Sequence, residues 1–142
     1  MTTALLDPND PKVAHAEERL RAELIVWLTT VDEDGQPQST PVWFWWDGGS
    51  FLVYSRPGAR KVRNIGANPK VSLHLEGNRV GGENVIFEGT AEPWTDAPPA
   101  SEVPGYIEKY RQRIESYGWT AESFASDYPD AFRVTPTRTR IW

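Results

Sequence analysis

Hydrophobic residues recur along the chain with two different spacings, and each spacing predicts a different kind of element. Val13, Ala16 and Leu20 stand three and four residues apart, shortly after Asp10 and a proline. This pattern is typical of a helix that begins with a capping aspartate and a proline in its first turn. We therefore predict a helix over residues 11–23. Short apolar runs and strict alternation in the residues that follow indicate strands instead.

Strand signals follow one another closely after this helix. Asp34-Gly35 is a strong hairpin-turn signal, and further glycine-rich turns separate apolar or alternating segments. The segments predicted as strands are 24–31, 38–46, 50–55, 70–76 and 83–94, with one or two more in 131–142 interrupted at Pro136. Six or so antiparallel strands at this spacing indicate a small β-barrel, in which no sheet edge is left exposed.

Further segments favour helices. A short helix over residues 59–67 is ended by Asn68-Pro69, because the residue before a proline avoids helical angles. Residues 101–117 carry helical spacing, and residues 120–128 favour one more short helix. The length of 142 residues is near the usual size of a domain. We expect one mainly β, antiparallel domain with flanking helices over residues 1–142.

The strand segment "PVWFWW" places aromatic side chains on both of its faces. In an extended chain Val42, Phe44 and Trp46 point one way, and Trp43 and Trp45 point the other. One face is expected to fill the barrel. The other face packs in an ordinary core, meets a planar ligand, or covers a second subunit.

Composition and charge exclude several classes of protein. The chain has no cysteine, which excludes disulfides and thiolate nucleophiles and fits a cytoplasmic location. No apolar run approaches the roughly 20 residues of a membrane span, and the N-terminus lacks the basic start of a signal peptide. A net charge of −5 argues against general nucleic-acid binding. Two histidines without an acidic cluster do not make a metal site.

A cationic segment stands out against this acidic background. Four cations fall within eight consecutive residues that contain no acid: Arg56, Arg60, Lys61 and Arg63. A Pro-Gly turn precedes the predicted helix, whose N-terminus favours an anion. Ser55 adds a hydroxyl group, and Asn64 shares a helix face with Arg60. The segment predicts a phosphate site, and the alternative is a solvated cationic helix face.

The chain offers no side chain that is expected to act as a nucleophile. It contains no GxSxG or similar nucleophile turn, and no serine–histidine–aspartate arrangement can be argued from it. We therefore predict no catalytic side chain, and an enzyme of this sequence would use a bound cofactor for its chemistry.

The segment from "TTVDEDGQPQSTPVWF" to "NPKVSLHLE", residues 29–76, resembles a known family. It is similar to the pyridoxamine 5′-phosphate oxidase-like group, and more narrowly to its actinobacterial deazaflavin-dependent oxidoreductases, which use coenzyme F420. The resemblance covers about residues 10–94, and the last dozen residues more loosely. It implies a split β-barrel that forms a homodimer, with a flavin or deazaflavin in a groove at each subunit interface.

The resemblance also implies which residues hold the cofactor. The backbone at Pro41, Val42 and Trp43 would lie along the tricyclic ring. The segment that grips the phosphate corresponds to Ser55, Arg60 and Lys61, with Arg56 and Asn64 close enough to help. "ENVIFEG" is similar to the "RQVRVEG" strand of the oxidases, so Asn84 stands at a cofactor-binding amide, although Glu83 replaces the arginine.

Departures from the family bear on substrate and cofactor. Thr135 stands in place of the histidine in the Arg-x-His of the true oxidases, so oxidation of pyridoxamine phosphate is not expected. The surplus cations Arg56 and Arg63 suit the charged tail of a deazaflavin, with FMN as the alternative cofactor.

The resemblance therefore implies hydride transfer between reduced coenzyme F420 and an electron-poor small molecule, such as an enone, a quinone or a tetrapyrrole. The alternatives are an FMN-dependent enzyme like the oxidases and a non-catalytic deazaflavin-binding protein.

Overall fold

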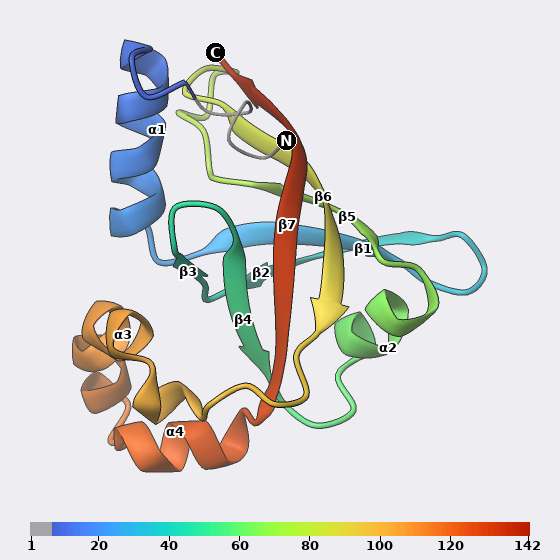
Figure 1. The fold of residues 1–142 in the computed structure, drawn as a ribbon, viewed down its shortest axis with the longest axis vertical. Coiled ribbons are helices and arrows are strands. Elements are labelled where there is room, and N and C mark those ends of the chain that lie inside the picture. The colour runs from blue at the N-terminus through green and yellow to red at the C-terminus, as the bar shows by residue number, and fades with distance from the viewer. Residues whose placement is uncertain (1–6) are drawn as a thin grey trace.

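The computed structural model describes residues 7–142 and is built on one curled, antiparallel sheet of seven strands (Figure 1). The strands lie in the order β2-β1-β5-β6-β7-β4-β3. This arrangement confirms the predicted mainly β fold of split-barrel type. The strands are β1 (Val26–Val31), β2 (Pro37–Val42), β3 (Trp45–Trp46), β4 (Phe51–Ser55), β5 (Lys70–His74), β6 (Val85–Pro93) and β7 (Asp130–Ile141).

The helices lie around this sheet, as Figure 1 shows. They are α1 (Pro11–Ala22), α2 (Arg60–Ala67), α3 (Pro104–Ser116) and α4 (Ala121–Asp127), with a 3-10 turn at Ala100–Glu102. Asp10 caps α1 by accepting the backbone N–H of Lys12, as the sequence predicted. Helix α2 connects β4 to β5, whereas α3 and α4 belong to the long connection between β6 and β7. Among residues 7–142, no helix is both long enough and apolar enough to cross a membrane.

The prediction of one continuous strand over residues 38–46 is wrong. Strand β2 ends at Val42 and pairs with β1, whereas β3 pairs with β4 at the other edge of the sheet. Trp43 and Phe44 therefore carry the chain from one edge of the curled sheet to the other. The Tyr110 hydroxyl lies 2.8 Å from the backbone nitrogen of Phe44 and 2.9 Å from its carbonyl oxygen, so it replaces the ladder partners that this link lacks.

The two faces of this aromatic segment behave as the alternation predicted. Val42, Phe44 and Trp46 are buried in the barrel core, whereas Trp43 and Trp45 pack against a second core built largely by α3 and α4. The second face is therefore covered in large part by the same chain.

Strand β7 runs through Pro136 without the predicted interruption. Its register with β6 shifts between Glu88 and Gly89, so that Gly89 lies opposite Pro136. A Cβ atom at Gly89 would lie 2.7 Å from the carbonyl oxygen of Thr135. The bulge accommodates the proline because the partner position is a glycine.

Candidate functional site

A cavity of about 610 Å³ opens where β2 and β4 end, and the turn before α2 and the α3–α4 region complete its walls. This volume lies within the range of about 300–1,000 Å³ that is usual for ligand pockets. Its lining residues are Pro41, Val42, Trp43, Tyr54, Ser55, Arg56, Pro57, Gly58, Ala59, Lys61, Tyr106, Tyr117, Trp119, Phe124 and Tyr128.

One part of the cavity is polar and cationic, and it comes from the end of β4 and the start of α2. Ser55 is 2% exposed, and its Oγ atom has no hydrogen-bond partner among the described residues. Gly58 has a φ of +72°, which a turn here requires and which glycine adopts without strain. The helix begins after Ala59, whose side chain cannot cap it. Its first N–H groups therefore favour an anion.

The cations of this segment form no close ion pair among the described residues. Among residues 7–142 none of the cations in 56–63 lies within 4.0 Å of a carboxylate oxygen, and no acidic residue of that range lines the cavity. Burial lowers the pKa of Lys61, because removal from water disfavours its charge. The Arg56 guanidinium lies over the ring of Tyr128, 4.7 Å from its centre. An anion in the cavity would have Arg56 and Lys61, the two cations that line it, as partners.

The other part of the cavity is aromatic, and the sequence reasoning missed it. Its side chains come from α3, α4 and the segments that flank α4: Tyr106, Tyr117, Trp119, Phe124 and Tyr128. Phe124 stacks against Trp43 at 5.4 Å and against Tyr128 at 4.7 Å between ring centres. The only signal for this wall in the sequence is the density of aromatic residues between positions 106 and 128.

The structure brings together six of the nine residues predicted to bind the cofactor: Pro41, Val42, Trp43, Ser55, Arg56 and Lys61. Arg60 and Asn64 line a neighbouring cavity of about 320 Å³, where acidic residues of the β1–β2 turn form another part of the wall. The side-chain nitrogen of Asn64 donates to Thr30 Oγ1 at 3.0 Å and to Gln38 Oε1 at 2.9 Å. Asn64 is buried and fastens α2 to the β1–β2 hairpin.

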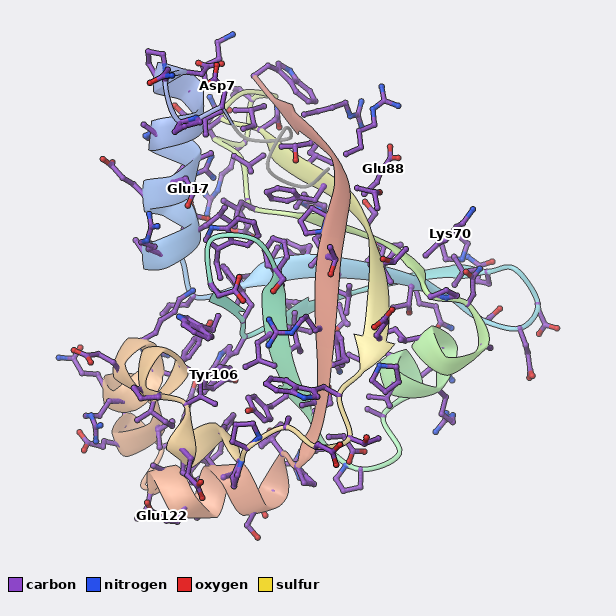
Figure 2. All side chains as sticks on the ribbon, viewed as in Figure 1. Asp7, Glu17, Lys70, Glu88, Tyr106 and Glu122 are labelled. Carbon is purple, nitrogen blue, oxygen red and sulfur yellow. The ribbon has the colours of Figure 1, made fainter. Side chains whose placement is uncertain are left out.

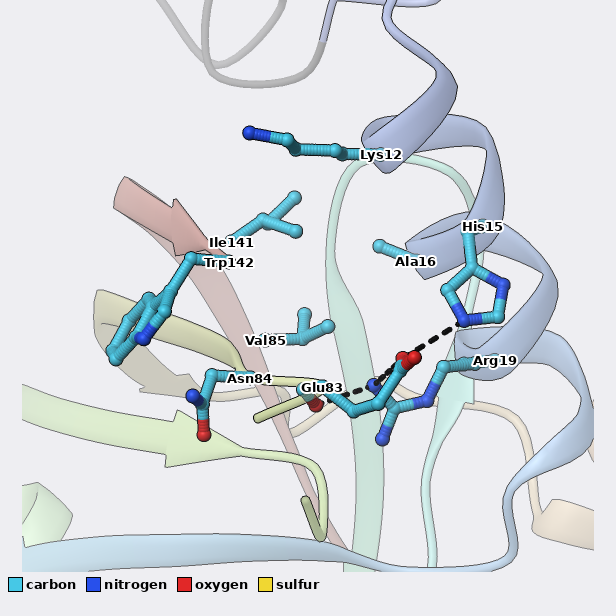
Figure 3. Close-up of a pocket in the computed structure, with 9 residues that line it drawn as sticks. All are labelled: Lys12, His15, Ala16, Arg19, Glu83, Asn84, Val85, Ile141 and Trp142. Carbon is cyan, nitrogen blue, oxygen red and sulfur yellow. Dashed lines mark hydrogen bonds and ion pairs between the residues drawn. The ribbon is translucent and has the colours of Figure 1, made fainter. Parts of the chain in front are cut away.

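Asn84 lies elsewhere, at a cavity of about 170 Å³ between α1 and the ends of β6 and β7 (Figure 3). Its side-chain nitrogen donates to the Gly81 carbonyl oxygen at 2.7 Å, and its backbone pairs with Trp142. His15 Nε2 lies 2.9 Å from Glu83 Oε2 in the same cavity, within hydrogen-bond distance. Within one chain, Asn84 is therefore separate from the cationic cavity.

Comparison with known proteins adds to this geometry. The family model described as pyridoxamine 5′-phosphate oxidase matches residues 13–142. The pyridoxine/pyridoxamine 5′-phosphate oxidase of Rhodopseudomonas palustris (strain TIE-1) is 27% identical over 161 residues, which cover 96% of this chain and 69% of that protein.

Two solved structures are also similar. One, described as an F420 reductase, is 26% identical with a TM-score of 0.64, and the match covers 87% of this chain and 94% of that chain. The heme storage protein of Vibrio cholerae is 21% identical with a TM-score of 0.63, covering 90% of this chain and 92% of that chain. The second likeness is one of fold.

Proposed function

The chain belongs to the pyridoxamine 5′-phosphate oxidase family, and we propose that it is an oxidoreductase that uses coenzyme F420. The proposed reaction is hydride transfer between the reduced deazaflavin and an electron-poor small molecule. One observation carries this proposal. The Ser55 hydroxyl is buried, has no hydrogen-bond partner among the described residues, and belongs to a cavity that Lys61 and the turn before α2 also line.

These residues fit a phosphate group. Ser55 offers a hydroxyl donor, Arg56 and Lys61 offer charge-assisted bonds, and the first N–H groups of α2 add partial positive charge. A phosphate here would also offset the desolvation that lowers the pKa of Lys61.

The rest of the cavity fits a flat ring system. Pro41, Val42 and Trp43 provide apolar surface for such a ring, as is usual in cofactor pockets. When bound, a reduced deazaflavin or flavin supplies the hydride. The chain then has to hold the ring and the acceptor close together and exclude water, which requires no nucleophilic side chain.

FMN is the second candidate cofactor, and the curated relatives named pyridoxine/pyridoxamine 5′-phosphate oxidase favour it. Two observations support the deazaflavin instead. One is the likeness to the structure described as an F420 reductase. The other is the cationic surface beyond the phosphate grip, where Arg63 is exposed beside the Pro57-Gly58 turn and donates to the Gly58 carbonyl oxygen.

We further propose a homodimer. Trp27 and His74 stack with ring centres 6.5 Å apart and are only partly buried, on adjacent strands β1 and β5. Trp142 at the end of the chain is 57% exposed. Because Asn84 is separate from the cationic cavity of its own chain, any contact of Asn84 with the cofactor would have to be made across the dimer interface.

Native mass spectrometry of the protein with equimolar FMN and coenzyme F420 tests both proposals at once. The expected species has twice the chain mass of 16.1 kDa and carries the deazaflavin in preference to FMN. The same mixture, with reduced deazaflavin and 1,4-naphthoquinone added, should then lose the absorbance of the reduced cofactor. Binding of neither cofactor would overturn the proposed function, and binding without turnover would leave a cofactor-binding protein.

A further inference from the structure

The two parts of the 610 Å³ cavity come from different regions of the fold. The polar residues belong to the β4–α2 connection, whereas the aromatic residues other than Trp43 and Tyr54 come from the connection between β6 and β7. We call these five side chains (Tyr106, Tyr117, Trp119, Phe124 and Tyr128) the aromatic wall. The residues that would hold a phosphate do not include this wall, so the role of the aromatic wall has to be explained separately.

Tyr106 is the unusual member of the aromatic wall. Its side chain lies on the side of α3 that faces β4 (Figure 2) and is completely buried. Its hydroxyl has no hydrogen-bond partner among residues 7–142. Two neighbouring buried tyrosines differ, because the Tyr54 hydroxyl donates to the Pro98 carbonyl oxygen at 2.6 Å and the Tyr110 hydroxyl bonds to backbone groups of residues 24 and 44.

An unpaired buried hydroxyl costs free energy that a phenylalanine would avoid. Tyr106 is one of the residues that line a cavity large enough for a ligand, and its hydroxyl is buried in the chain without a ligand. The arrangement is explained if a ligand supplies the missing partner.

We propose that the aromatic wall is the acceptor subsite and that Tyr106 donates a hydrogen bond to a carbonyl oxygen of the acceptor. The acceptor is a flat, conjugated carbonyl compound, either neutral or anionic. Its role as the hydride acceptor rests on the function proposed above. A flat acceptor fits this wall because the residues that line it are aromatic.

Charge and protonation support the same assignment. Arg56 and Lys61 line the cavity, and no acidic residue of the described range does so, which disfavours a cationic acceptor. Burial raises the pKa of Tyr106 well above its usual value, and the nearby tyrosines add to the effect. Its hydroxyl therefore stays protonated at neutral pH and remains a donor.

A binding experiment without cofactor tests the proposal. Equilibrium dialysis would compare 1,4-naphthoquinone with naphthalene, which has the same shape but no carbonyl group, on the unaltered protein and on Tyr106→Phe. We expect Tyr106→Phe to weaken quinone binding about 5-fold to 10-fold, the scale of one hydrogen bond, and to leave naphthalene binding unchanged. The absence of cysteine from the chain excludes loss of the quinone to thiols.

Tyr54→Phe is the matched control, because the Tyr54 hydroxyl is already bonded within the chain. It should leave the ratio of quinone to naphthalene affinity unchanged. Failure of the quinone to bind, or an equal change for both ligands in Tyr106→Phe, would overturn the proposal.

Thermal stability gives a second readout. Tyr106→Phe should melt at the same or a higher temperature, because it removes an unpaired buried hydroxyl, whereas Tyr54→Phe should melt at a lower temperature. A lower melting temperature for Tyr106→Phe would show that the hydroxyl already has a partner in the free protein, and would overturn the proposal.

The subsite and the proposed function can fail separately. Quinone binding that depends on Tyr106, in a protein that binds neither FMN nor coenzyme F420, would keep the subsite and overturn the cofactor. Cofactor binding without quinone binding would keep the proposed cofactor and overturn the acceptor subsite.

Discussion

Two hydroxyl groups, of Ser55 and Tyr106, are buried beside the same cavity and have no hydrogen-bond partner among the residues that the structure describes. They differ in their surroundings. Ser55 stands next to Arg56 and three positions before Gly58, at the cationic part of the cavity. Tyr106 is surrounded by aromatic rings. We therefore propose that one hydroxyl donates a hydrogen bond to an anion and that the other donates to a carbonyl oxygen.

Lys61 should be the main charged anchor of the cofactor. We predict that Lys61→Ala weakens cofactor binding by about 1.5–3 kcal/mol, the scale of a hydrogen bond to a charged group. The rate on bound cofactor should change far less, because a phosphate grip does not touch the reacting carbon. Fluorescence titration with FMN and with coenzyme F420 measures the effect.

Lys70→Ala is the matched control for Lys61→Ala, because Lys70 is exposed at the start of β5 and outside the cavity lining. Arg60→Ala is informative as well, since Arg60 lines the neighbouring cavity and should have the smaller effect. Unchanged cofactor affinity in Lys61→Ala would show that the cationic segment is a solvated helix face and not a phosphate site.

Asp47 should make the stability of the fold depend on pH in acid. Burial opposes the charge of its carboxyl group, but hydrogen bonds from Gly49, Ser50 and Arg133 outweigh it and lower the pKa. A group whose pKa is lowered by folding stabilises the folded state above its unfolded pKa, and this contribution is lost as the pH falls through the folded value. The stabilising effect is therefore complete above about pH 5 and shrinks below about pH 4.

Urea unfolding of the unaltered protein and of Asp47→Asn, from pH 7 to pH 3, measures this contribution. The two free energies of unfolding should differ by a constant amount near neutral pH and converge in acid. Glu18→Gln, at an exposed position of α1, is the control for the loss of one carboxylate. A difference that stays constant down to pH 3 would contradict the prediction.

At the scale of elements, the sequence pattern located most helices and strands but missed the break between β2 and β3. Val42, Phe44 and Trp46 alternate with Trp43 and Trp45 without interruption. The pattern therefore shows no sign that the chain changes strand partners. The break is made by a distant residue, because Tyr110 of α3 takes the place of a neighbouring strand at Phe44. Local periodicity contains no information about such a contact.

Removal of the Tyr110 hydroxyl should loosen this link. Tyr110→Phe leaves the backbone N–H of Phe44 without its acceptor and removes the one O–H donor that faces the carbonyl oxygens of Leu24 and Phe44. We expect a loss of about 1–3 kcal/mol in the free energy of unfolding, the cost of leaving a buried donor unpaired. Tyr117→Phe, at a side chain that is 51% exposed, is the control and should change the stability little. Equal stabilities for the two variants would assign the β2–β3 link to packing alone.

At the scale of the whole molecule, the candidate site was predicted only in part. Residues close together in the sequence, such as Ser55 and Lys61, do line one cavity, because a strand, a turn and a helix follow one another directly there. The aromatic wall is supplied by a connection about fifty residues later in the chain. Its position, and the unpaired state of Tyr106, are set by tertiary packing and leave no local pattern. Asn84 was matched by strand similarity, which says nothing about which subunit's site it serves.

The charge of the whole molecule gives the last prediction. The chain carries −5 overall, yet Arg56 and Arg63 are both exposed, and the Arg63 side chain donates to the carbonyl oxygen of Gly58, which lines the cationic cavity. If they serve the charged tail of coenzyme F420, Arg56→Ala/Arg63→Ala should weaken deazaflavin binding and leave FMN binding nearly unchanged. One phosphate is already held at Lys61, whereas each glutamate of the tail adds a charge for these two arginines.

The effect should also fade with salt, because screening at 0.15 M ionic strength acts over about 8 Å and exposed charges are the most affected. Titration of the double variant with both cofactors, at low and at physiological ionic strength, measures it. Arg111→Ala/Arg138→Ala removes the same two charges at exposed positions outside the cavity lining, so it controls for the change in net charge. If the control loses as much deazaflavin affinity as Arg56→Ala/Arg63→Ala, the change in net charge alone would explain the effect. Equal losses for both cofactors would mean that these arginines contact the phosphate, which FMN and coenzyme F420 share, and that the tail lies elsewhere.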